Sequence, residues 1–577
     1  MTNLRWRKKQ TKEVKKSTPN ADRVVDKKEL AIKKRETQEK IQKLITVASV
    51  SIFLGVIFAV PVGYLTDNFK YGIMTVVAVT ALILSYFYPR TSLWTFLVYL
   101  PFNGTVVYWL GDGNTILQIS KDVLYFPALI RLVVDCKKQK QPILVSKVII
   151  PGLAIFLTFA LLTFVVVNVQ QQFYISCDLV SERWVIGPDG RNYLYPCREG
   201  SPVLGGLLGL KVLIGYIPLI FCTYYLIKDI NCLRFMLRLM VTVAIIACVL
   251  GIIQFWFLRT GICQGTRGAS GDDLYKATLA AKCFVGGSLI YSPEVGMIRL
   301  PGTFVSPWHW GWFLVSNAII CFAASFSEVS KWWRSLGILA LSLVFINAVI
   351  CGQRLAFIAV PLIITVLIVL TGQITNFKRF IPIAIVVGIL LAVGVLLVNP
   401  DFAQQRLQSA INRWNNSPPL LFIQQQIEYS TDRYYSFLGW GLGKATSSAR
   451  VFWPVIFLET FFAKLIYEMG YVGFVAFLIF ITSLVYATFM VFIKIRDPNL
   501  RTIGGSFWLF MVIVAYVPYW YPLDTDPVGI YYWTFAGVIF RIPVIEKQQK
   551  EQALAQSDNP RDEKKLLKLK RKNISLA

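Results

Sequence analysis

The chain has 577 residues, 55% of them hydrophobic, and a mean hydropathy of +0.56. Apolar runs separated by short charged breaks extend from about residue 44 to 542, each with the roughly 17–25 residues that cross ~30 Å of hydrocarbon as a helix. This pattern excludes a soluble enzyme with one anchor. It predicts an all-α polytopic membrane protein with about 12–14 transmembrane helices and large extracytoplasmic loops.

The two tails supply +9 and +4, together +13 of the formal net charge of +27. Residues 1–44 hold 15 Lys/Arg against 6 Asp/Glu, and residues 544–577 hold 9 against 5. Basic tails beside membrane spans usually face the cytoplasm and anionic lipid. No nucleic-acid-reading module accompanies them, so we expect membrane lipids and no nucleic acid as partners. The first run follows 44 polar residues without a small-residue cleavage site, so we do not interpret it as a signal peptide.

The candidate spans, in chain order, are 45–65, 71–88, 92–111, 115–134, 147–168, 204–227, 235–258, 307–326, 335–352, 355–371, 381–398, 469–493, 503–521 and 529–543. Asn103 interrupts the third run, and Asp122 and Pro127 interrupt the fourth. Either of these runs could be re-entrant.

Loop charge orients these spans. If the N-terminus is cytoplasmic, the cytoplasmic connections are all short and basic, as the Lys/Arg excess of such loops requires. We therefore expect both termini in the cytoplasm. The predicted segments are the tail 1–44, spans in 45–168, the outer loop 169–203, spans in 204–398 with the outer loop 259–306, the large outer loop 399–468, spans in 469–543 and the tail 544–577.

Four of the ten cysteines lie in the outer loops, as the pairs Cys177 with Cys197 and Cys263 with Cys283. Each pair is separated by 20 residues in a polar loop, which favours one disulfide per loop in an oxidising compartment. Free thiols are the alternative. Zinc is disfavoured because neither loop contains a histidine and the pairs lack the CxxC form.

Most soluble-enzyme signatures are missing: there is no Walker loop, dinucleotide fingerprint, HExxH or GxSxG motif. His309 is the single histidine, which argues against a histidine-based metal site or a Ser-His-Asp triad. We therefore expect neither a metal nor a cofactor.

Three polar clusters lie at predicted outer helix ends. The first, residues 299–313, contains Arg299, Gly302 and His309; Gly302 would permit a close approach of backbone to ligand, although the Trp-rich stretch also suits an interfacial belt. The second, residues 351–357, contains Arg354, which could bind an anion or simply extend to the interface.

The third cluster lies in the longest outer loop and contains Arg433, Tyr434 and the Gly439–Gly443 turn. Gly441 and Gly443 make positive φ accessible, so backbone N–H groups there could cradle anionic oxygens. Glu459 and Glu468 follow. Nine residues apart on a helix, they would point in opposite directions, and we expect Glu459 to be the deeper of the two.

In order, the motifs read R-x-x-G-T-F-x-x-P, x-x-R-x-A, R…G-x-G-x-G and E-T-x-x-x-x-L-x-x-E-x-G-x-x-G. From about residue 204 to 493 this pattern resembles the O-antigen ligase and Wzy-type polysaccharide polymerase superfamily. The resemblance implies a metal-independent glycosyltransferase of the bacterial cytoplasmic (inner) membrane. Its donor would be a polyprenyl-diphosphate-linked glycan, and its acceptor a glycan or lipid.

The resemblance assigns catalytic roles to Arg299, Arg354, Arg433 and Glu459. The arginines would hold the diphosphate, and Glu459 would orient or deprotonate the acceptor hydroxyl. His309, Tyr434, Gly441 and Gly443 are the expected substrate-binding residues. Two positions depart from the pattern, since Trp308 replaces a common Asn and Gln353 the usual Ser. Glu459 stands where ligases commonly have His-Asn, which favours a polymerase-like or divergent member.

A membrane transporter of a small anion such as bicarbonate is the main alternative, and a non-catalytic scaffold is another. Transporters usually carry ionisable residues within their spans, near broken helices. Lys211 and Asp122 are the best examples here, and Asp122 could pair with the adjacent Lys121.

Overall fold

The computed structural model describes residues 19–143, 145–179, 184–186, 192–194, 197–267, 269, 281–292, 297–373, 408, 411–412, 414–431, 437–517 and 523–555. The chain divides into two compact units. The first comprises Met1–Ser92 and Val123–Arg131, and the second Leu93–Asp122 and Leu132–Ala577.

The longer helices are α1 Pro19–Leu65, α2 Phe69–Phe87, α3 Pro89–Tyr99, α5 Asp122–Lys138, α6 Ile150–Thr163, α8 Pro202–Ile214, α9 Leu219–Leu226, α10 Ile230–Arg259, α11 Pro307–Ser327, α12 Lys331–Ile350, α13 Arg354–Leu370, α16 Pro419–Thr431, α17 Phe461–Phe492, α18 Pro498–Tyr516 and α19 Val528–Ala555. Single turns form α4 Asn103–Thr105 and α7 Gln170–Gln172. π-helical segments at Val106–Leu110 and Phe164–Val169 continue α4 and α6. Two antiparallel hairpins lie in loops: β1 Trp184–Ile186 with β2 Asn192–Leu194, and β3 Ile290–Ser292 with β4 Met297–Arg299.

The protein is an all-α polytopic membrane protein. Among the described residues, ten helices are long and apolar enough to cross a membrane, or eleven if α8 and α9, bent by 42°, form one span. α13 has the 17 residues of a shorter apolar helix. The predicted run 115–134 differs: a 3-10 turn covers Thr115–Ile119, and α5 begins only at Asp122. The predicted span 381–398 lies outside the described residues.

The first unit contains the α1–α2 hairpin. The Asn68 side chain accepts a hydrogen bond from the Lys70 N–H and caps α2. Gly55 lets the helices approach closely, because a Cβ there would lie 3.0 Å from the Val76 carbonyl oxygen. Only 11% of the apolar window of each helix is buried, as expected of helices that face lipid.

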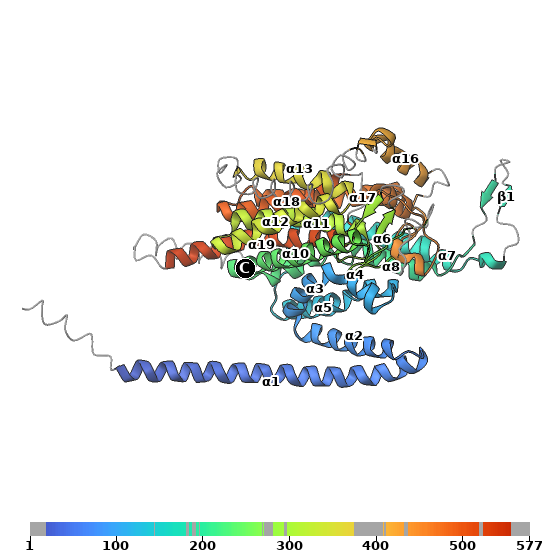
Figure 1. Ribbon diagram of the computed structural model, residues 1–577. Helices are drawn as coiled ribbons and strands as arrows, with labels where there is room; N and C mark the ends of the chain where they lie inside the picture. The colour runs from blue at the N-terminus through green and yellow to red at the C-terminus, as the bar shows by residue number, and fades with distance from the viewer. Residues whose placement is uncertain are drawn as a thin grey trace, which may run out of the picture. The chain divides into compact units, whose positions relative to one another are not determined.

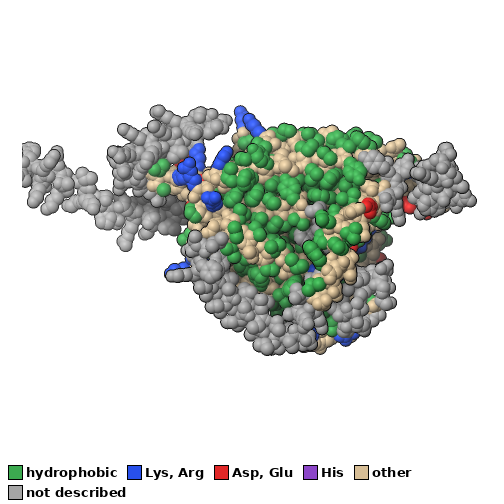
Figure 2. All heavy atoms as spheres, turned by 90° about the horizontal axis from the view of Figure 1, so that it is seen from above, with side chains coloured by type: hydrophobic (Ala, Val, Ile, Leu, Met, Phe, Trp, Pro, Cys, Tyr) green, Lys and Arg blue, Asp and Glu red, His purple; other side chains and the backbone are tan. Residues whose placement is uncertain are grey.

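In the second unit, α11 is buried along its whole apolar window and packs against α10, α12, α13 and α18 (Figure 1). Its sequence alternates aromatic with small residues, which allows close packing on all sides. The face of the protein seen in Figure 2 is largely apolar, and most of the Lys and Arg side chains visible there lie toward its left edge.

Several predicted boundaries move. α1 begins at Pro19, within the predicted tail 1–44. α17 begins at Phe461, so the helix takes in the last eight residues of the predicted outer loop 399–468. α19 continues to Ala555, so the predicted tail 544–577 begins as helix. Both predicted disulfides, Cys177–Cys197 and Cys263–Cys283, are present in the structure.

Candidate functional site

The segments that carry Arg299 and Arg354 meet. β4 ends at Arg299, and the next backbone N–H, from Leu300, donates to the Cys351 carbonyl 2.9 Å away. Cys351 directly follows the last residue of α12 and caps that helix. Arg354 is the first residue of α13, and its side chain is exposed. One backbone hydrogen bond therefore joins two motifs that are far apart in the sequence.

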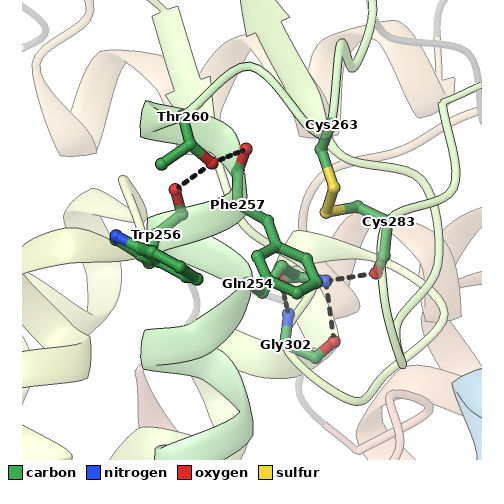
Figure 3. The surroundings of a disulfide bond; sticks show 7 residues. All are labelled: Gln254, Trp256, Phe257, Thr260, Cys263, Cys283 and Gly302. Atoms are coloured by element: carbon green, nitrogen blue, oxygen red, sulfur yellow. Dashed lines mark hydrogen bonds between the residues drawn. A yellow bond between two sulfur atoms is a disulfide. The ribbon is translucent and has the colours of Figure 1, made fainter.

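A buried glutamine of α10 fixes the loop that follows Arg299 (Figure 3). The Gln254 Oε1 accepts from the Gly302 N–H at 3.0 Å, and Nε2 donates to the carbonyls of Gly302 at 3.2 Å and Cys283 at 2.9 Å. Cys283 is in turn held by its disulfide to Cys263. The expected close approach at Gly302 is made to Trp310, whose ring lies 2.3 Å from where a Cβ would be.

His309 lies in the first turn of α11 and is partly buried. Its Nδ1 lies 2.6 Å from the Ser306 hydroxyl oxygen. The charges of Asp526 and Lys121 also act on this imidazole, so His309 adjoins the buried ionic cluster described below.

The residues that follow the glycine turn bind one carboxylate oxygen of the protein itself, that of Glu468. Gly441 and Gly443 adopt positive φ values of 106° and 87°. Beyond this reversal, the Ala445 N–H and the Thr446 hydroxyl donate to Glu468 Oε1 at 2.8 and 3.0 Å. The Gly441 N–H binds the Glu468 carbonyl at 3.1 Å. The turn thus folds back onto the first part of α17.

The predicted order of depth of the two glutamates is wrong. Glu468 is 2% exposed, whereas Glu459 is exposed in the segment just before α17. There the Glu459 N–H donates to Gln426 Oε1 of α16 at 2.7 Å. Glu468 lies inside α17, two residues before the kink at Gly470, rather than at the start of a span. Arg433 and Tyr434 lie outside the described residues.

Three buried Lys–Asp pairs join distant segments of the second unit. Lys121 Nζ lies 2.5 Å from Asp526 Oδ2, and Lys211 Nζ lies 2.6 Å from Asp122 Oδ2. Lys464 of α17 pairs with Asp524. Asp122 therefore pairs with Lys211 and not, as expected, with its neighbour Lys121.

The Lys211–Asp122 pair lies near the break between α8 and α9. Tyr216 follows α8, and its hydroxyl donates to Asp122 Oδ1 at 2.6 Å and accepts from Lys211 at 3.0 Å. Burial alone would raise the pKa of Asp526, but Lys121, with smaller contributions from His309 and Lys211, holds that pKa below its usual range. These interactions keep the cluster's charges locally matched.

Sequence reasoning passed over Lys464, Asp524 and Asp526. The signal was present: lysines inside apolar runs require a carboxylate nearby, and the short loop before α19 contains two. A narrow cavity adjoins them, with room for little more than a water molecule. It is lined by Gly209, Val212, Leu213, Thr446, Phe461, Lys464, Glu468, Phe477, Leu523, Asp524 and Trp533.

Another ionic contact lies between two loop segments that the sequence predicts to be on the outer side. Lys444 Nζ lies 3.7 Å from Glu199 Oε2 and 4.5 Å from the centre of the Trp453 ring. Burial lowers the pKa of Lys444, and Glu199 partly opposes this shift. Within the described ranges, no group of three His, Cys, Asp or Glu side chains is arranged to hold a metal ion.

Comparison of the chain with models of known protein families and with curated proteins found no match.

Proposed function

We propose that this protein transfers or polymerises a polyprenyl-diphosphate-linked glycan at the outer face of the bacterial cytoplasmic membrane, with both termini cytoplasmic. The observation that carries the proposal is the Leu300–Cys351 hydrogen bond, which brings the Arg299 and Arg354 segments together. Their motifs are two of those on which the resemblance to O-antigen ligases and polymerases rests. The acceptor would be a glycan or a lipid.

The chemistry needs cations where the leaving diphosphate develops charge. Arg299 and Arg354 can each bind two phosphate oxygens, and fixed cations near developing charge lower the barrier to transfer. Arg433 would be the third phosphate ligand. Because Glu468 is held by the glycine turn, the exposed carboxylate of Glu459 is the better candidate to orient or deprotonate the acceptor hydroxyl.

The test measures polyprenyl-linked glycans in cells that lack the protein and in cells rescued with variants. Single repeat units accumulating on the lipid would support a polymerase, and full-length glycan accumulating there would support a ligase. Arg299→Ala, Arg354→Ala and Glu459→Gln should fail to rescue. Arg259→Ala, at the end of α10 and outside the motifs, should rescue fully. An unchanged lipid-linked pool would overturn the proposal.

One observation favours transport of a small anion as the second candidate. The bend of 42° between α8 and α9 lies beside the buried Lys211–Asp122 pair, the combination of broken helix and intramembrane charge seen in carriers. An unchanged lipid-linked pool together with lost uptake of labelled bicarbonate would favour this function.

A further inference from the structure

The cavity beside α17 combines three kinds of lining. Lys464, Glu468 and Asp524 supply charge, Thr446 supplies a hydroxyl, and three aromatic rings supply apolar surface. The rings belong to Phe461, Phe477 and Trp533. Carboxylates beside aromatic faces are suited to a ligand that has both hydroxyl groups and apolar C–H faces.

The charge of this lining argues against an anionic ligand. Lys464 is already paired with Asp524, and Glu468 adds a carboxyl group, so the lining leaves no cation available to an anion. The neighbouring pairs Lys121–Asp526 and Lys211–Asp122 are each neutral. An anion entering this buried site would lose its hydration without gaining a cationic partner.

The hydrogen-bonding capacity of the cavity points to a hydroxyl group. One oxygen of Asp524 is paired with Lys464, while the other, Oδ1, is buried and receives no hydrogen bond from the described residues. A buried acceptor of this kind is costly unless a donor reaches it. The cavity is too small for a whole sugar ring, but one hydroxyl group would occupy about the space of a water molecule.

We infer that this cavity is a subsite for a neutral sugar, which inserts one hydroxyl-bearing arm toward Asp524. This inference rests on the proposed function and extends it. The arginine segments would bind the diphosphate, whereas this cavity binds an uncharged part of the glycan. The same chemistry makes it a poor site for bicarbonate or pyrophosphate.

The test uses the full chain in lipid nanodiscs and saturation-transfer difference NMR. The probes are glucose, galactose and N-acetylglucosamine, with bicarbonate and inorganic pyrophosphate as competitors at matched ionic strength. At least one sugar should receive saturation from the protein. Leu213→Phe, which fills the cavity, should abolish the signal, and Leu207→Phe, on the exposed face of the same helix, should not.

Asp524→Asn provides a second variant that keeps the side-chain shape; because it also leaves the buried Lys464 without its charged partner, its folding is first checked by tryptophan fluorescence. Loss of the charge-assisted hydrogen bond should weaken sugar binding by about tenfold. Displacement by either anion would overturn the inference. So would the absence of binding by every sugar, or equal signals from the Leu213→Phe and Leu207→Phe proteins. If the lipid-linked pool depends on the protein while no sugar binds, only the subsite is wrong. If a sugar binds here while that pool is unchanged, only the proposed function is wrong.

Discussion

Glu468→Ala should destabilise the protein far more than Glu459→Ala. The substitution leaves the Ala445 N–H and the Thr446 hydroxyl without their acceptor, and it removes a carboxylate near the buried Lys464. Each unsatisfied buried donor costs about 1–3 kcal/mol. For these two donors we therefore expect a loss of about 2–6 kcal/mol.

Two matched variants isolate the cause. Glu468→Gln keeps an oxygen that can accept both hydrogen bonds and should cost only about 1–2 kcal/mol. Glu459→Ala removes an exposed side chain and should change stability by no more than about 0.5 kcal/mol. The free energies of unfolding would be measured by denaturation of the purified protein in detergent, followed by tryptophan fluorescence.

A double-mutant cycle with Thr446→Val tests the contact itself. If the Thr446 hydroxyl bonds to Glu468, the two substitutions should be non-additive by about 0.5–3 kcal/mol. Equal destabilisation by Glu459→Ala and Glu468→Ala would refute the assignment of the buried role to Glu468, and strict additivity would refute the bond.

Three further predictions follow from the same structure. Gly470→Ala should lower the free energy of unfolding by about 3 kcal/mol or more, because its Cβ would lie 2.1 Å from a backbone carbonyl oxygen. Gly372 has a similar positive φ but open space around it, so Gly372→Ala should lower that free energy by only about 1 kcal/mol. Equal losses measured by denaturation would contradict this reasoning. Burial alone would raise the pKa of Glu328, but the bidentate hydrogen bonds from Arg238 hold that pKa below its usual range. The stabilisation from this carboxylate is therefore present above the ordinary glutamate pKa and is lost as the pH falls through the lowered pKa. Glu328→Gln should accordingly reduce the dependence of the free energy of unfolding on pH in the acid range. Lys211→Met or Asp122→Asn alone should cost about 3–5 kcal/mol, whereas the double variant should recover most of that loss, and equal instability of all three would contradict a simple pair.

Much of the fold was predictable from the sequence because the bilayer imposes a length and a polarity on every span. The cysteine spacing likewise predicted both disulfides, since each pair lies in one polar loop. Loop charge placed the Arg299 and Arg354 segments on the same predicted side of the membrane, and a backbone hydrogen bond joins them. These features depend on local sequence or on the membrane boundary.

The errors concern contacts between distant residues. Glu468 is buried because the turn at 439–446 folds back onto α17, and nothing in the local sequence of α17 predicts that packing. Lys121 finds its partner Asp526 at a separation of 405 residues, so Asp122 is left to pair with Lys211. Charge spacing along one segment cannot identify such partners, although it does indicate that partners are needed.

The buried lysines and the exposed arginines differ in whether their charge is balanced, and this difference predicts where the anionic and neutral parts of a substrate would bind. Within the described part of the chain, the buried lysines Lys121, Lys211 and Lys464 each face an aspartate, so the buried cluster offers no surplus positive charge to an anion. The exposed Arg354 and the partly exposed Arg299 lie at helix and strand ends instead. A substrate with an anionic head and a neutral glycan would match this division, because its phosphates would meet the arginines while its sugars met the hydrogen-bonding cavity. A small anion alone would use only the first of these two environments.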